Sequence, residues 1–84
     1  MPDVRYPTMP RLQFRLTDEF IALNDLLKVT GVCASGGAGK ALVATGAVAV
    51  DGTVEMRKTC KVRRGQTVTV GNVAIDVLPG DPTG

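Results

Sequence analysis

The sequence predicts an α+β domain in which two short N-terminal helices pack on a small, mostly antiparallel sheet. Two observations support this class. The spacing of apolar residues changes from about 3.6 residues before Gly46 to two residues after it. The later part also contains two hairpin-turn signals, Asp51-Gly52 and Gly71-Asn72. With 84 residues, the chain holds one domain, which we place at residues 11–78 and which buries roughly 60% of the unfolded surface.

One strand and one helix are expected at the start of the domain. Residues 11–16 alternate apolar and polar side chains, which is typical of a half-buried strand at a sheet edge. Thr17 is a good N-cap, and Asp18 and Glu19 would lie favourably in a first helical turn. The first helix is therefore predicted over residues 18–30.

A second helix is predicted to begin at Ser35 and to end at Gly46. Helical spacing predicts a core-facing stripe of Ala38, Ala41, Leu42 and Thr45. The opposite face would carry Gly36, Gly37, Lys40 and Ala44. Three glycines in one short helix cost roughly 1 kcal/mol each relative to alanine. Either close approach of a ligand backbone or loose packing on the first helix would account for them.

The rest of the domain reads as strands and turns. Strands are expected at residues 47–50, from Val54 onward, and at residues 67–70 and 73–78. A turn at Gly65-Gln66 follows the basic segment, which is residues 57–64. The two ends of the chain are expected to be a flexible arm, residues 1–10, and a disordered tail, residues 79–84.

Positive charge is concentrated in the middle of the chain. Residues 28–64 contain seven basic and two acidic side chains, a net charge of +5, while the remainder carries −3. If the basic segment is extended, Arg57, Lys61 and Arg63 form a basic stripe on one face, with Cys60 and Val62 on the other. This asymmetry favours a polyanion as partner, and a solvated charged face is the alternative.

Several classes of function find no support. The chain has no histidine, and its acidic residues are scattered, so no catalytic arrangement is expected. Two isolated cysteines, Cys33 and Cys60, cannot make a zinc site and are expected as buried or half-buried thiols in a reducing cytoplasm, with a disulfide as the alternative. Ala34 and Ala41 break the P-loop pattern around GGAGK. We therefore expect no enzyme, no cofactor, no metal and no membrane span, and too few aromatic residues for base-stacking platforms.

The order of these elements resembles the RNA-binding domain named after small-subunit ribosomal protein S4, also called the alpha-L motif. The matching positions are Ser35, Leu42-Val43, Gly46, Val48, Val50, Asp51-Gly52, Val62, Gly65 and Val68. The run V-x-V-D-G-x-V-E-x-R-K-x-C-K-V-x-x-G-Q is especially similar to bacterial proteins that consist of this domain alone. The match covers residues 18–78. Gly36, Gly39 and Asp51 depart from the family's usual Arg, Ala and Asn.

The resemblance implies a monomeric, non-catalytic module that grips structured RNA, either ribosomal or transfer RNA, and whose partners extend to a ribosome or ribosomal subunit. The expected RNA-binding residues lie on the second helix and in the basic segment: Ser35, Gly36, Gly37, Lys40, Arg57, Lys58, Lys61, Arg63 and Arg64. Side-chain cations would contact phosphates, and free amides at the helix start could bind another phosphate. The alternative is a protein-interaction module that docks an acidic partner or an RNA-modifying enzyme.

Overall fold

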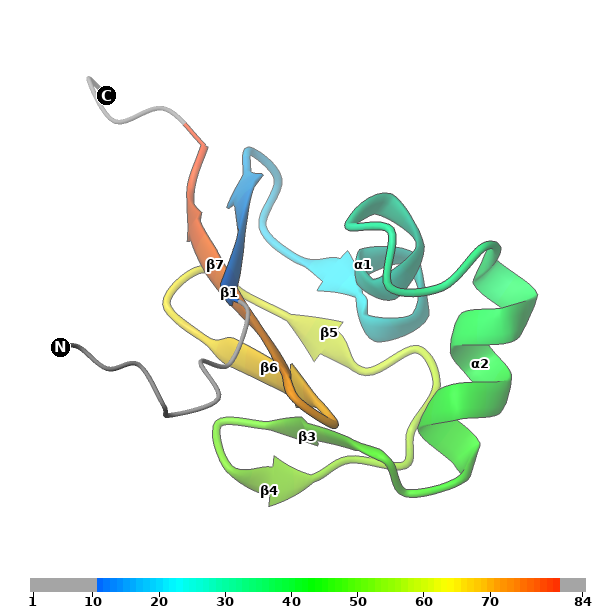
Figure 1. Cartoon of the computed structure of the whole chain (residues 1–84). Coiled ribbons are helices and arrows are strands. Elements are labelled where there is room, and N and C mark those ends of the chain that lie inside the picture. Colours follow the sequence, from blue (N-terminus) through cyan, green and yellow to red (C-terminus); the bar gives the residue numbers. More distant parts are fainter. Residues whose placement is uncertain (1–10, 81–84) are drawn as a thin grey trace, which may run out of the picture.

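The computed structural model describes residues 11–80, which form a five-stranded sheet, a two-stranded sheet and two helices (Figure 1). The elements are β1 (Arg11–Leu16), β2 (Ile21–Ala22), α1 (Leu23–Val29), α2 (Gly36–Ala44), β3 (Val48–Val50), β4 (Thr53–Val54), β5 (Lys61–Val62), β6 (Thr67–Val70) and β7 (Val73–Pro79). The arm predicted over residues 1–10, and residues 81–84 of the predicted tail, lie outside the described residues.

The larger sheet has the strand order β1-β7-β6-β3-β4. Only the β1–β7 pair in it is parallel, while the other pairs are antiparallel. The predicted α+β class and mostly antiparallel sheet are therefore confirmed, and β1 forms an edge as expected. The N-terminal placement of the helices is not confirmed, because β1 and β2 precede both of them.

The predicted turns connect the strands of the larger sheet. Asp51 and Gly52 both have positive φ, 52° and 85°, which matches the twist that a two-residue hairpin requires. Gly71, with φ 56°, begins the turn between β6 and β7. Strand β7 runs one residue beyond the predicted end, to Pro79, and the Gly80 amide then donates to the Leu16 carbonyl at 3.0 Å.

The core is aliphatic, as the composition indicates. Three leucines of α1, namely Leu23, Leu26 and Leu27, are completely buried. They pack with branched side chains from the sheets and α2: Val43, Val48, Val62, Val68, Ile75 and Val77. Burial of each such side chain contributes roughly 1.5–3 kcal/mol, so this cluster is the main source of stability.

The predicted start of the first helix is wrong. Helix α1 begins at Leu23 rather than at Asp18, and Thr17 does not cap it. The preceding residues pair with β5 instead, with Ile21 opposite Val62. Because the amides of Leu23 and Asn24 donate to carbonyl groups of the basic segment, at 2.9 and 3.1 Å, the helix needs no side-chain cap.

The second helix begins as predicted but buries a different face. The Ser35 hydroxyl accepts a hydrogen bond from the Ala38 amide at 3.1 Å, which confirms the N-cap. The buried residues of α2 are Gly39 and Val43, so the predicted core stripe is wrong. Three of its members, Ala38, Ala41 and Thr45, are exposed and line an open, mostly apolar groove.

A close contact between the helices explains this orientation. A Cβ atom on Gly39 would lie 2.8 Å from the carbonyl oxygen of Asn24 in α1. Only a residue without a side chain lets the two backbones approach so closely. Gly39 is therefore required by tight packing of α2 on α1, so neither a ligand backbone nor loose packing explains this glycine. Neither described helix has the length and apolar character needed to cross a bilayer.

Candidate functional site

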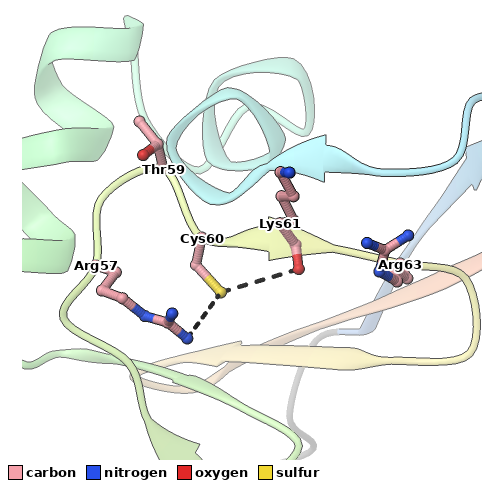
Figure 2. A pocket seen from close by; sticks show the side chains of 5 residues that line it. All are labelled: Arg57, Thr59, Cys60, Lys61 and Arg63. Atoms are coloured by element: carbon pink, nitrogen blue, oxygen red, sulfur yellow. Dashed lines mark hydrogen bonds between the residues drawn. The ribbon is translucent and has the colours of Figure 1, made fainter.

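An open depression of about 540 Å³ lies beside β5 (Figure 2). Its lining residues are Arg57, Thr59, Cys60, Lys61 and Arg63. The three members of the predicted basic stripe therefore line one depression. Cys60 lines it as well, whereas Val62 is completely buried in the core. The prediction that Cys60 lies apart from the stripe, with Val62, does not hold.

The segment between β4 and β5 is held in place through its backbone. The Glu55 amide donates to the Val48 carbonyl at 2.9 Å, and the Cys60 amide donates to the Arg57 carbonyl at 3.1 Å. At the other end of the segment, the carbonyl groups of Lys58 and Cys60 accept hydrogen bonds from the start of α1. This loop therefore has defined anchors although it contains little regular structure.

Asn24 connects the loop to the second helix. Its amide donates to the Lys58 carbonyl, and its own carbonyl lies against Gly39, the residue before Lys40. The middle of α2 and the basic loop consequently meet the same residue of α1. The backbone of Lys58 and the residue before Lys40 meet at this junction, and both lysines are exposed.

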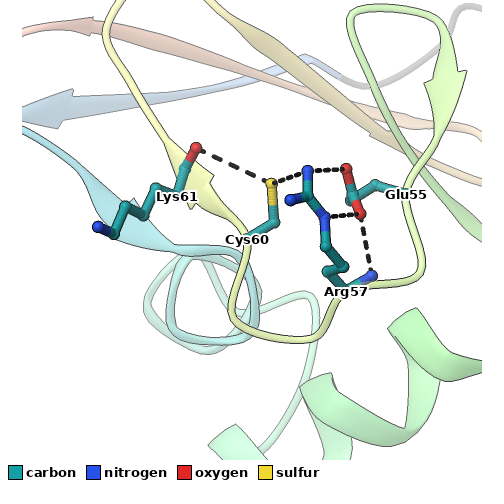
Figure 3. Close-up of polar contacts among 4 residues, drawn as sticks. All are labelled: Glu55, Arg57, Cys60 and Lys61. Carbon is teal, nitrogen blue, oxygen red and sulfur yellow. Dashed lines mark hydrogen bonds and ion pairs between the residues drawn. The ribbon is translucent and has the colours of Figure 1, made fainter.

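Arg57 is paired with a carboxylate (Figure 3). Its Nε donates to Glu55 Oε2 at 2.9 Å and its Nη2 donates to Glu55 Oε1 at 3.1 Å. The Arg57 amide also donates to Glu55 Oε2, at 3.0 Å. These hydrogen bonds to the charged carboxylate lower the pKa of Glu55 to about 2 and raise that of Arg57. Arg57 therefore presents a guanidinium whose charge is largely compensated.

The Cys60 thiol lies beside this pair. Its Sγ is 3.9 Å from Arg57 Nη2 and 3.9 Å from the Lys61 carbonyl oxygen. Desolvation by burial and the nearby Glu55 carboxylate raise the pKa of Cys60 above its ordinary value. Both Cys60 and Cys33 are free and half-buried, as predicted, and a raised pKa keeps the Cys60 thiol protonated.

Phe20 is a residue of this site that the sequence did not indicate. Lys61 Nζ lies 4.9 Å from the centre of the Phe20 ring, and Arg63 Cζ lies 5.9 Å from it. The first helix predicted over residues 18–30 includes Phe20, yet the residue is 37% exposed and precedes β2. No local pattern signals this arrangement, because it results from pairing between β2 and β5.

The remaining predicted residues do not line the depression. Ser35 caps α2, and Gly36 and Gly37 form its first turn. Arg64 is exposed in the turn before β6, where the Arg63 amide donates to Gln66 Oε1 at 2.7 Å. Gln66 Nε2 in turn donates to Asp51 Oδ2 at 3.1 Å. The described contacts do not join Ser35 or Arg64 directly to the depression.

Among the basic residues of the predicted site, Arg57 is in an ion pair and the others are in none within residues 11–80. Within residues 11–80, the ion pairs join Arg57 to Glu55 and Arg11 to Asp76. The other basic residues of the region have no carboxylate partner in that range: Lys40, Lys58, Lys61, Arg63 and Arg64. No group of three or more acidic or sulfur ligands that could hold a metal occurs among the described residues. Within residues 11–80, no ion pair therefore compensates the charge of these five side chains.

Comparison with known proteins identifies the family of this chain. The family model described as S4 domain matches residues 14–78, which is most of the chain. The chain therefore belongs to the S4 domain family.

Two relatives and one solved structure show how close the similarity is. The chain is 45% identical over 58 residues to "Putative RNA-binding protein YbcJ" of Escherichia coli (strain K12), covering 69% of this chain and 83% of that protein. The same values hold for "Uncharacterized protein YbcJ" of Shigella flexneri. The solution structure of Escherichia coli YbcJ, described as revealing an alfaL motif involved in RNA-binding, superposes with a TM-score of 0.64 at 36% identity. That match covers 93% of this chain and 98% of the YbcJ chain.

Proposed function

We propose that this protein binds structured RNA, without catalysing a reaction, through a surface that we call the basic surface. It consists of the start and middle of α2 and the segment from Arg57 to Arg64. The observation that carries the proposal is the set of exposed cations around the depression without carboxylate partners among residues 11–80. Membership of the S4 family and the name of the Escherichia coli relative support RNA as the ligand.

The cations of the basic surface would contact phosphate oxygens. Lys40 and Lys58 flank the junction at Asn24, while Lys61 and Arg63 line the depression. Arg64 would extend the contacts along the backbone of the RNA. Phosphate contacts of this kind supply affinity with little dependence on sequence, so the protein would recognise the shape of a folded RNA.

The start of α2 would contribute backbone donors. Ser35 caps one amide, and the exposed Gly37 leaves space for a phosphate to approach the helix start. The positive end of the helix dipole favours an anion there. Gly36 and Gly37 therefore belong to the proposed surface, and Lys40 supplies the side-chain charge on the same helix.

Arg57 has a more limited role in this proposal. Its guanidinium is already bound by Glu55 through two hydrogen bonds. Its exposed N–H groups could still reach one phosphate, but the adjacent carboxylate reduces the local positive potential. We therefore assign more of the affinity to Lys58 and Lys61 than to Arg57.

The proposal also covers the kind of RNA and the setting of the protein. The RNA is ribosomal or transfer RNA, and the larger partner is a ribosome or ribosomal subunit. The protein is monomeric and cytoplasmic. These assignments follow from the resemblance described above and from the two free cysteines. The alternative to RNA is an acidic protein partner.

A salt titration tests the proposal. Binding of labelled bulk transfer RNA and of purified small-subunit ribosomal RNA is measured by filter retention at several salt concentrations. About four neutralised phosphates give a slope of log affinity against log salt near −3 to −4. Lys58→Ala should reduce the magnitude of this slope by roughly 1.

Arg15→Ala is the matched control, because Arg15 is an exposed cation on β1 that is not part of the basic surface. It should leave the slope within error. A salt-independent affinity, or equal losses for both variants, would reject the basic surface. In parallel, partners captured from a lysate with and without ribonuclease are compared, and capture that survives digestion would favour a protein partner over RNA.

A further inference from the structure

Two cations that line the depression lie over the exposed ring of Phe20. Lys61 Nζ and Arg63 Cζ lie over the Phe20 ring, 4.9 and 5.9 Å from its centre. Both distances are within the range at which the negative face of a ring attracts a cation. Lys61 and Arg63 also line the depression, whereas Phe20 does not.

Strand pairing places these three residues together. Ile21 is opposite Val62 and Ala22 is opposite Lys61 in the antiparallel β2–β5 pair. Continuing this register by one residue puts Phe20 opposite Arg63 and diagonal to Lys61. Because side chains alternate along a strand, these residues share the outer face while Val62 points into the core, where it is completely buried.

Long basic side chains lose considerable rotamer freedom when they bind a phosphate. A ring that already holds both head groups near the mouth of the depression reduces that loss, because the cations are ordered before the ligand arrives. The small Ala22 side chain opposite Lys61 leaves the lysine stem room to lie toward the ring.

We propose that Phe20 is a positioning residue for RNA binding, which holds Lys61 and Arg63 so that they clamp the phosphate backbone together. This inference rests on the proposed function, because it assigns a role within the same surface. Phe20 acts through the two cations and does not itself contact the RNA.

The test compares Phe20→Leu with Phe20→Tyr. Leucine keeps apolar bulk but removes the ring, and tyrosine keeps the ring, so Phe20→Leu should weaken binding of a fully paired hairpin RNA by about 2- to 5-fold while Phe20→Tyr stays near wild type. Circular dichroism and thermal melting check folding. If Phe20→Leu does not fold, Phe20→Met replaces it as the variant without a ring.

A double-mutant cycle shows whether Phe20 acts through the cations. In a Lys61→Ala, Arg63→Ala background, Phe20→Leu should cause no further loss of affinity. An additive loss would overturn the proposal, as would tighter or unchanged binding by Phe20→Leu in the wild-type background.

A second RNA, the same hairpin with one unpaired nucleotide, separates positioning from base stacking. Equal losses for both RNAs support positioning, whereas a loss confined to the unpaired nucleotide would overturn it in favour of stacking on the ring. If the wild-type protein binds neither RNA, the proposed function itself fails. If it binds both and Phe20→Leu changes nothing, only this inference fails.

Discussion

The carbonyl oxygen of Asn24 in α1 lies 2.8 Å from the place that a Cβ atom on Gly39 of α2 would occupy. The Asn24 amide meanwhile donates to the Lys58 carbonyl. One residue of α1 therefore sets both the distance between the helices and the position of the basic loop. The side-chain Oδ1 of Asn24 is buried without a hydrogen-bond partner among the described atoms, so the backbone of this residue carries these interactions.

Gly39→Ala should destabilise the fold by about 1–3 kcal/mol, because its methyl group would overlap backbone atoms of α1 that cannot rotate away. The measurement is urea unfolding followed by circular dichroism. Gly37→Ala is the matched control, since its methyl group would meet only Ser35 Oγ at 3.9 Å. It should stabilise the protein by up to about 1 kcal/mol. Equal effects of the two variants would contradict the close helix contact.

Ser35→Ala should cost about 0.5–2 kcal/mol, because the hydrogen bond from the Ala38 amide to Ser35 Oγ is lost. Thermal melting measures the effect. Ser35→Asp restores an acceptor at the N-cap and should recover most of the lost stability. If aspartate were as damaging as alanine, the hydroxyl would have another role than capping.

Asp51→Ala should destabilise the sheet by roughly 1–3 kcal/mol. Asp51 Oδ1 accepts from the Thr67 amide at 3.0 Å and Oδ2 accepts from Gln66 Nε2 at 3.1 Å. Alanine loses both acceptors and is also disfavoured at φ 52°. Asp51→Asn keeps one acceptor and tolerates this backbone conformation, so its cost should be clearly smaller in the same urea titration. A cost equal to that of alanine would show that the charge matters more than the geometry.

The Glu55–Arg57 pair should make stability depend on pH in acid. The pKa of Glu55 is about 2 in the folded protein, below its ordinary 4.5. A lowered pKa contributes stability above about pH 4.5 that is lost as the pH falls toward 2. Glu55→Gln should therefore lower the urea midpoint at pH 7, and its difference from wild type should shrink between pH 4.5 and 2.

Glu19→Gln is the control for that experiment, because Glu19 is exposed and forms no ion pair within residues 11–80. It removes a carboxylate without removing an ion pair of the described part of the chain, so its effect at pH 7 should be small. A difference between Glu55→Gln and wild type that stays constant from pH 7 to pH 2 would exclude a stabilising ion pair.

Local signals predicted the features that depend on few residues. The turn at Asp51-Gly52, the N-cap at Ser35 and the hairpin at Gly71-Asn72 each depend on the backbone preferences of one or two residues. Such preferences act over a few positions and can be read directly from the sequence. The alternation of residues 11–16 likewise identified an edge strand.

The errors arose where distant residues decide the structure. Thr17 is a suitable N-cap, but pairing of Ile21 with Val62, across 41 positions of the chain, delays the helix. The buried face of α2 was missed because Gly39 has no apolar side chain to reveal its burial. The joint placement of Arg57, Lys61 and Arg63 was anticipated, whereas the compensation of Arg57 by Glu55 depends on a loop conformation that no periodicity encodes.

The hydrogen bonds from the Leu23 and Asn24 amides to the Cys60 and Lys58 carbonyls link the order of the loop to the fraying of α1. Any molecule that tightens the loop must also slow the opening of these two bonds. Deuterium uptake at the amides of Leu23 and Asn24 would then report occupancy of a surface to which neither side chain belongs.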